Sequence, residues 1–117
     1  MSEIRIMILN KENDVLFQET GEGQAVLVYE KAYQEGDKIR VEAEELNIFY
    51  WLQMDNAIGR SLIYLTGAVE YEIPFGEKRW NLSDLTFEGD RHVVTVRKAR
   101  EYDYDHYRNL SYNANDQ

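Results

Sequence analysis

The chain has 117 residues, enough for one hydrophobic core and too few for two ordinary domains. Hydrophobic residues make up 44% and charged residues 30% of the sequence, which fits a folded globular domain rather than a disordered segment. The 22 acidic and 13 basic residues give a formal charge of −9, and this charge would repel a nucleic-acid backbone or an anionic membrane surface. We therefore expect neither nucleic acid nor a membrane among the partners.

The sequence contains no cysteine, which excludes disulfides, zinc–thiolate sites and thiol catalysis. The short apolar run near the N-terminus is interrupted by Glu3 and Arg5 and lacks a small-residue cleavage site, so no signal peptide is predicted. No segment approaches the roughly 20 apolar residues that a membrane helix needs. A soluble, cytoplasmic protein is favoured on these grounds, although exported bacterial domains can also lack cysteine.

Strand-like segments separated by polar or glycine-containing turns fill the first half of the chain. Ile4, Ile6 and Ile8 repeat with the two-residue period of a strand. The same reasoning predicts a short strand that opens at residues 15–17 and is ended by the glycines of residues 21–23, and further strands at 24–33, 38–44 and 47–54. The second of these contains a continuous apolar run and is expected to be buried on both faces, whereas the third should have one wet face. The fourth is rich in aromatic residues and is expected to be a central strand.

The second half of the chain continues this pattern and then loosens. Strands are predicted at residues 60–66, 69–75 and 92–97, with a last strand at 106–112. Ser83-Asp84 is expected to form a single helical turn. Residues 98–104 have helical spacing between strand-like flanks, so both readings stay open. The polar residues 113–117 are expected to fray.

The overall pattern predicts an all-β fold. Several short strands with turn signals about every 8–12 residues are typical of an antiparallel β-sandwich or a small barrel. Segments of helical length do not alternate with the strands, which argues against a parallel βαβ architecture. The sequence shows no internal repeat, low-complexity tract or linker. We therefore expect residues 1–117 to form a single β-sandwich domain.

Catalytic motifs are sparse. His92 and His106 are the two candidate bases, and neither lies in a recognisable nucleophile motif. We expect His92 at a sheet edge or on the surface, and His106 on a solvated acidic face. Glu70 and Glu72 would share one face of a strand and could act as a glycosidase pair, but an exposed strand face explains them better. The prediction is that the protein is not an enzyme.

Metal and phosphate motifs are also weak. Asp103 and Asp105 could supply hard oxygen ligands to a structural calcium ion, but no loop has the EF-hand pattern. Gly21-Glu22-Gly23 lacks the following glycine and the helix of a phosphate-binding loop. We expect no cofactor, and a structural calcium ion stays open.

Aromatic and polar residues near one predicted hairpin are more informative. A sugar presents C–H groups on a ring face and hydroxyls at its rim, which suit an aromatic platform beside amides, carboxylates or arginine. If residues 47–54 and 60–66 pair, Trp51 and Tyr64 come close together. The candidate carbohydrate-binding residues are Trp51, Gln53, Asp55, Asn56, Arg60, Tyr64 and Trp80. The alternative is that Trp51 and Tyr64 pack in the core.

Four segments carry a resemblance to a known group of proteins. They are Asn47–Asp55, Tyr64–Gly67, Tyr71–Lys78 and Tyr107–Leu110. From about Val28 onward the chain resembles the N-terminal domain of uncharacterised carbohydrate-binding-like proteins of Firmicutes. The resemblance implies a galactose-binding-like jelly roll, often joined to a second, discoidin-like domain, so this chain could be the N-terminal domain of a longer protein. It implies no particular binding residue.

Two functions follow from these observations. The first is a non-catalytic carbohydrate-binding module whose partner is a glycan or small sugar. The alternative is a structural or interaction domain that braces a neighbouring β-sandwich domain or forms a homo-oligomer, with exposed aromatic residues at a protein interface.

Overall fold

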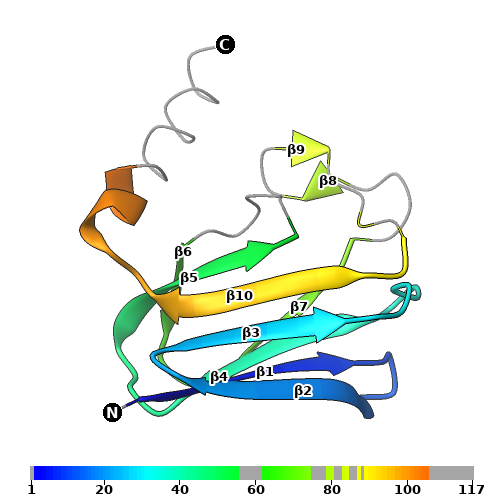
Figure 1. Ribbon diagram of the computed structural model, residues 1–117, viewed down its shortest axis with the longest axis horizontal. Helices are drawn as coiled ribbons and strands as arrows, with labels where there is room; N and C mark the ends of the chain where they lie inside the picture. Colours follow the sequence, from blue (N-terminus) through cyan, green and yellow to red (C-terminus); the bar gives the residue numbers. More distant parts are fainter. Residues whose placement is uncertain are drawn as a thin grey trace.

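The computed structural model describes residues 2–55, 62–74, 79–80, 83–84, 87 and 89–105. Its strands are β1 (Glu3–Leu9), β2 (Val15–Glu22), β3 (Gln24–Tyr29), β4 (Lys38–Ala43), β5 (Ile48–Met54), β6 (Leu62–Leu65), β7 (Val69–Glu72), β8 (Arg79–Trp80), β9 (Ser83–Asp84) and β10 (His92–Lys98). Sheet A has the order β2-β1-β4-β7, and sheet B has the order β3-β10-β5-β6. All neighbouring strands in these two sheets are antiparallel. The predicted antiparallel β-sandwich is confirmed (Figure 1).

The core lies between the inner faces of the two sheets. Sheet A contributes Ile4, Ile6 and Ile8 from β1, and sheet B contributes residues such as Leu27 and Leu52, all of them at most 1% exposed. Each such side chain stabilises the fold by about 1.5–3 kcal/mol relative to an exposed position. The two-residue period of the sequence therefore becomes the layered core of a sandwich.

Several sequence predictions are confirmed. β4 alternates as expected, because Ile39 and Val41 are buried whereas Arg40 is partly exposed. β5 is a central strand between β10 and β6, and it forms the predicted antiparallel hairpin with β6. β10 begins at the expected residue and extends to Lys98, after which residues 101–105 form a helical turn. The ambiguous stretch therefore holds the end of a strand and a short helix.

Two predictions are wrong. β3 is not buried on both faces, because Val26 is 40% exposed while Ala25 and Leu27 are buried. β3 is an edge strand of sheet B, and its outer side chains point away from the core. Ser83-Asp84 does not form a helical turn but pairs as β9 with β8. The strand predicted at 106–112 lies outside the described residues.

Gly21 lies where β2 approaches the start of β3. A Cβ atom added at this position would lie 2.0 Å from the backbone oxygen of Gln24, so the backbone would have to move. We expect Gly21→Ala to lower the free energy of unfolding by about 1–3 kcal/mol. Gly67→Ala is the control, because nothing lies within 4 Å of the added carbon there. Urea unfolding of both variants measures the difference, and equal stabilities would contradict the tight approach at Gly21.

The described part of the chain contains no helix with the length and apolar character needed to cross a membrane.

Candidate functional site

The candidate residues on β5 lie on the outer face of sheet B. Tyr50, Leu52 and Met54 point into the core, and Trp51 and Gln53 alternate with them on the opposite side. The prediction that Trp51, Gln53 and Asp55 project from one face of a strand is confirmed for Trp51 and Gln53 and is wrong for Asp55, which turns toward the buried His92. What covers that face decides which of them can meet a ligand.

Trp51 is covered by an arginine. Its side chain lies opposite Arg97 in the β5–β10 register, and the guanidinium carbon of Arg97 is 5.4 Å from the centroid of the indole ring. Such a cation–π contact is attractive. Trp51 is consequently only 8% exposed, although it lies outside the main core cluster. The indole supports Arg97 and does not present an open stacking surface.

Asp55 binds its own chain. Its Oδ2 atom lies 2.9 Å from Nδ1 of His92, and its Oδ1 atom accepts a 2.8 Å hydrogen bond from the backbone N–H of Val93. The residue has a left-handed φ of 53°, a conformation that aspartate and asparagine tolerate better than most residues. Gln53 also makes local contacts, accepting from Trp51 Nε1 and donating to the Asp55 carbonyl at 3.4 Å each. Both side chains therefore brace the end of β5.

The expectation that His92 lies at the surface is wrong. His92 is fully buried on the inner face of β10, and its ring stacks on Tyr33 with centroids 4.0 Å apart. Burial is tolerated because both ring nitrogens lie within hydrogen-bond distance of an oxygen, the Asp55 carboxylate on one side and the Gly89 carbonyl at 3.0 Å on the other. Within the described residues the Tyr33 hydroxyl has no hydrogen-bond partner. Burial, followed by the nearby Asp55 carboxylate, raises the pKa of Tyr33 above its ordinary value.

A cluster of exposed aromatic rings lies beside Trp51, and the sequence analysis named only one of its members, Tyr64. Phe49 is two residues before Trp51 and contacts Tyr64, with ring centroids 4.9 Å apart. Tyr104 packs edge-on against Phe49 at 5.5 Å, and Tyr102 is 57% exposed on the same helical turn. We call these four residues, Phe49, Tyr64, Tyr102 and Tyr104, the aromatic patch. The signal for Phe49 was its alternation with Trp51, since both point to the outer face.

An ion pair holds the helical turn in place. Arg97 donates two hydrogen bonds to the Asp103 carboxylate, at 2.7 and 3.0 Å, and the backbone N–H of Arg100 donates a third at 2.6 Å. Burial by itself would raise the pKa of Asp103, but the bonds from Arg97 and Arg100 outweigh it and lower the pKa below its ordinary value. The carboxylate is 1% exposed and engaged at both oxygens, so it is not a free ligand for the calcium ion considered from sequence.

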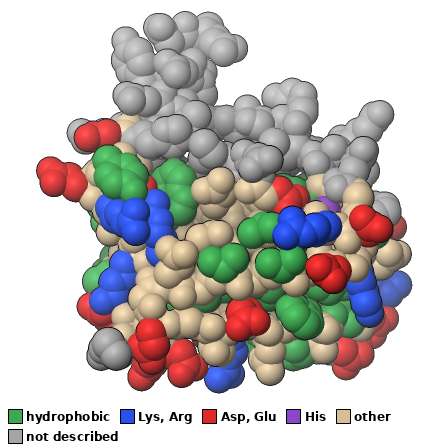
Figure 2. Space-filling model, viewed as in Figure 1, with side chains coloured by type: hydrophobic (Ala, Val, Ile, Leu, Met, Phe, Trp, Pro, Cys, Tyr) green, Lys and Arg blue, Asp and Glu red, His purple; other side chains and the backbone are tan. Residues whose placement is uncertain are grey.

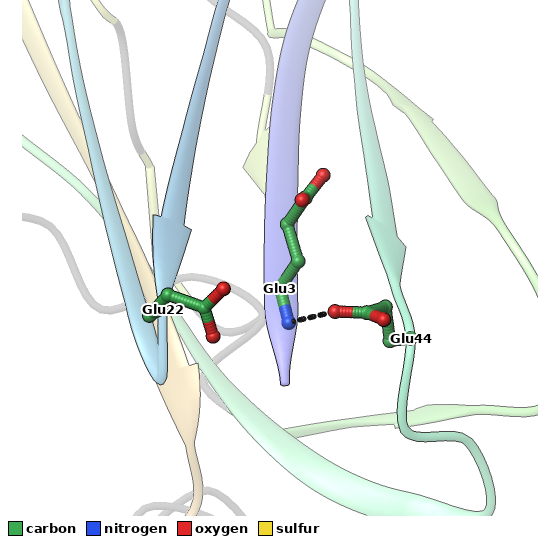
Figure 3. A group of neighbouring side chains, drawn as sticks. All are labelled: Glu3, Glu22 and Glu44. Atoms are coloured by element: carbon green, nitrogen blue, oxygen red, sulfur yellow. Dashed lines mark hydrogen bonds between the residues drawn. The ribbon is translucent and has the colours of Figure 1, made fainter. Parts of the chain in front are cut away.

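A group of carboxylates gathers at the other sheet. Oxygens of Glu3, Glu22 and Glu44 lie within 4.8 Å of one another, and the Glu3 backbone N–H donates a 2.7 Å hydrogen bond to Glu44 (Figure 3). Exposed acidic groups are common on protein surfaces without an ion, and one Glu44 oxygen is already engaged by the Glu3 backbone. Arg5, 3.6 Å from the Glu3 carboxylate, offsets part of the charge. The group forms an acidic surface at this end of sheet A.

The other residues singled out in the sequence lie on a strand face or outside the described residues. Glu70 and Glu72 are exposed on β7, and Arg40 pairs with Glu70 at 3.0 Å, which fits a solvated strand face. Asn56 and Arg60 lie outside the described residues. The backbone of Trp80 belongs to β8, but its side chain is likewise outside the described part of the structure.

The fold and this surface define the chain as a two-sheet antiparallel β-sandwich with an aromatic patch on one outer face. Comparison with protein-family models, with curated proteins and with solved structures finds no match.

Proposed function

We propose that the chain is a non-catalytic carbohydrate-binding domain whose ligand surface is the aromatic patch on sheet B. The single observation that carries the proposal is the exposure of the patch. Tyr64 is 48% exposed and Phe49 39% exposed, although neighbouring outward residues such as Trp51 are buried. Large aromatic rings in contact with one another and with solvent are costly to leave uncovered, and such patches commonly mark binding surfaces.

The chemistry of the patch suits a sugar. Aromatic faces accept the C–H groups of a pyranose ring, and tyrosine hydroxyls can exchange hydrogen bonds with its hydroxyl groups. Polar groups border the rings, since Arg100 donates a 2.8 Å hydrogen bond to the Tyr102 hydroxyl and the guanidinium carbon of Arg97 lies 5.9 Å from the centroid of the Tyr102 ring. The patch is therefore apolar at its centre and polar at its rim.

The proposal changes the roles of the residues chosen from sequence. Tyr64 stays as a ligand-contacting residue and gains Phe49 and Tyr104 as neighbours. Trp51 becomes a support, because it carries the Arg97 side chain that anchors the helical turn. The support matters because an aromatic platform recognises a sugar better when its rings are already fixed before binding.

The proposed jelly-roll, galactose-binding-like assignment has topological support. Consecutive strands β2 and β3, β3 and β4, and β4 and β5 belong to opposite sheets, so the chain crosses the sandwich repeatedly. Two four-stranded antiparallel sheets with such crossings are compatible with the eight-stranded jelly roll that we propose. Fold does not fix function, so the carbohydrate proposal depends on the patch.

Titration of the ¹⁵N-labelled protein with a panel of neutral and acidic oligosaccharides tests the proposal. We expect amide shifts at Phe49, Tyr64 and Tyr104 for at least one oligosaccharide. Tyr64→Ala should weaken that binding by about tenfold, since an aromatic contact is typically worth ~0.5–1.5 kcal/mol beyond its burial.

Leu46→Ala provides the control, because Leu46 is 38% exposed but belongs to none of the ring contacts of the patch. It should bind the oligosaccharide with unchanged affinity. Shifts that map away from the patch would refute the site. An absence of shifts with every sugar at about 10 mM would refute the function, because that concentration detects even weak affinities.

A further inference from the structure

The outer strand of sheet A is exposed along its length. β2 pairs with β1 on one side, and no described strand pairs with its other edge, which lies at the bottom of Figure 1. Every residue of β2 is exposed except Gly21, which is partly exposed. A long unpaired edge offers a row of backbone donors and acceptors to another strand. Natural sheets often shorten or cover such an edge, so a long exposed one is a candidate site for strand addition.

The hydrogen-bond pattern identifies which backbone groups are available. The Gly23 N–H donates to the Ser2 carbonyl, which makes these two residues a hydrogen-bonded pair of the β1–β2 ladder. Because hydrogen-bonded and non-hydrogen-bonded pairs alternate in antiparallel sheets, Gly21 and Glu19 also point toward β1. The backbone groups of the residues between them point the other way, toward the free edge. These residues are Gln18, Thr20 and Glu22.

The hydrogen bonds between β1 and the chain after β4 lead to the same alternation. The Glu44 N–H donates to the Glu3 carbonyl, so the backbone groups of Glu3 point toward β4 and not toward β2. Glu22, its register partner on β2, must then direct its own backbone groups outward. Two independent hydrogen bonds therefore assign the same backbone groups of β2 to the free edge.

An apolar groove accompanies this edge. It has a volume of about 500 Å³ and is lined by Leu16, Phe17, Val28, Tyr29, Glu30 and Lys31. Val15, Leu16 and Phe17 are 51%, 41% and 44% exposed, an unusual run of three consecutive apolar residues at the surface. Hydrophobic side chains reach the surface across the face seen in Figure 2, with charged side chains around them. The groove can accept side chains of a strand that bonds to β2.

We propose that β2 binds an extended peptide segment of another protein by strand addition, and that this segment alternates apolar with basic residues. The backbone of the segment would bond to Gln18, Thr20 and Glu22, and its apolar side chains would enter the groove beside Phe17 and Val28. This inference goes beyond carbohydrate binding and does not depend on it, because it concerns a different edge of the molecule.

Charge favours a basic partner over a second copy of this chain. β2 carries Glu19 and Glu22, and the whole chain has a formal charge of −9, so two copies repel each other. If β2 pairs in antiparallel fashion with β2 of a second copy, the outward backbone groups of the two strands must face each other. Two registers satisfy this condition and overlap the strands over nearly their whole length. One opposes the two Glu19 carboxylates, and the other places Phe17 against Glu19. Like charges directly opposite each other destabilise a strand pair, whereas lysine or arginine on the face of Glu22, the face opposite to the one that carries Phe17 and Glu19, stabilises it.

Hydrogen exchange of the ¹⁵N-labelled chain tests the proposal with a short peptide of alternating valine and lysine. The amides of Gln18, Thr20 and Glu22 should exchange at least about tenfold more slowly with the peptide, because each becomes a ladder donor or lies beneath the added strand. The amides of Glu19 and Gly21 should change little, since they already bond to β1. A peptide of alternating valine and glutamate should give no protection.

Two variants separate the backbone and groove contributions. Thr20→Pro removes an outward N–H while leaving the bonds to β1, a position where an edge strand tolerates proline, and should weaken peptide binding about tenfold or more. Leu16→Lys should weaken it to a similar degree through the groove. Leu46→Lys is the matched control, with comparable exposure of the native leucine, and should leave peptide affinity unchanged. If circular dichroism shows that Thr20→Pro does not fold, the peptide affinity of Leu16→Lys tests the proposal instead.

Three results would overturn the proposal. The first is a lack of peptide binding at about 1 mM, a concentration that reveals even weak strand addition. The second is protection or shifts at the aromatic patch instead of β2. The third is protection of Gln18, Thr20 and Glu22 without peptide that rises with protein concentration, which would show that a second copy occupies the edge.

Discussion

Asp55→Ala should lower the free energy of unfolding by about 3 kcal/mol or more. The variant removes the acceptor for His92 Nδ1 and for the Val93 N–H. Each buried donor left without a partner costs about 1–3 kcal/mol. Alanine also tolerates the φ of 53° poorly, which adds about 1 kcal/mol. Chemical denaturation at neutral pH measures the loss.

Asp55→Asn separates these contributions. Asparagine tolerates a left-handed backbone and keeps one acceptor oxygen, so this variant should lose roughly half as much stability as Asp55→Ala. Asp90→Ala is the control, because Asp90 is exposed in the turn before β10 and its substitution should change stability by less than about 0.5 kcal/mol. If Asp55→Ala matched Asp90→Ala, the proposed structural role of Asp55 would be refuted.

Arg97→Met should destabilise the attachment of residues 101–105 by about 3 kcal/mol at neutral pH, because it leaves the buried Asp103 carboxylate without its partner. Methionine keeps much of the contact with Trp51 but cannot donate hydrogen bonds. Arg40→Met is the control, because the Arg40–Glu70 pair is about one-third exposed and should contribute at most ~1 kcal/mol. Hydrogen exchange at Asp103 and limited proteolysis after β10 measure detachment of the helical turn.

The effect of Arg97→Met should depend on pH. The pKa of Asp103 in the folded chain lies below its ordinary value of 3.8, through the bonds from Arg97 and Arg100 working against burial. The ionised group therefore contributes stability above pH 3.8, and this contribution is lost as the pH falls through the lower, folded value. The stability difference between wild type and Arg97→Met should shrink on acidification below this value. A difference that stays constant with pH would exclude the ion pair as its cause.

The same variant connects stability to the proposed function. Tyr102 and Tyr104 belong to the helical turn that Arg97 and Asp103 hold against sheet B. Release of this turn should separate Tyr104 from Phe49. Arg97→Met should therefore weaken oligosaccharide binding, as Tyr64→Ala does. Peptide binding at β2 should be unaffected, because that strand lies in the other sheet. The two proposals can thus fail separately.

The candidate site was only partly predictable. The hairpin of β5 and β6 and the shared face of Trp51 and Gln53 follow from two-residue alternation and from one connecting loop. The register of this hairpin could not be predicted in the same way. Tyr64 lies opposite Phe49, whereas Trp51 lies opposite Leu62. A shift of two residues along a strand keeps the same face, so the hydrophobic pattern cannot distinguish these pairings.

The class of fold could be predicted from the sequence, because strand periodicity and turn residues are local properties that do not depend on how the sheets are arranged. Which outward side chains meet solvent depends instead on tertiary contacts. Arg97, which the Asp103 carboxylate holds in place, covers Trp51, and Asp55 turns inward toward the buried His92. These contacts join segments distant in the chain, and their geometry depends on how the sheets stack, which no local pattern encodes.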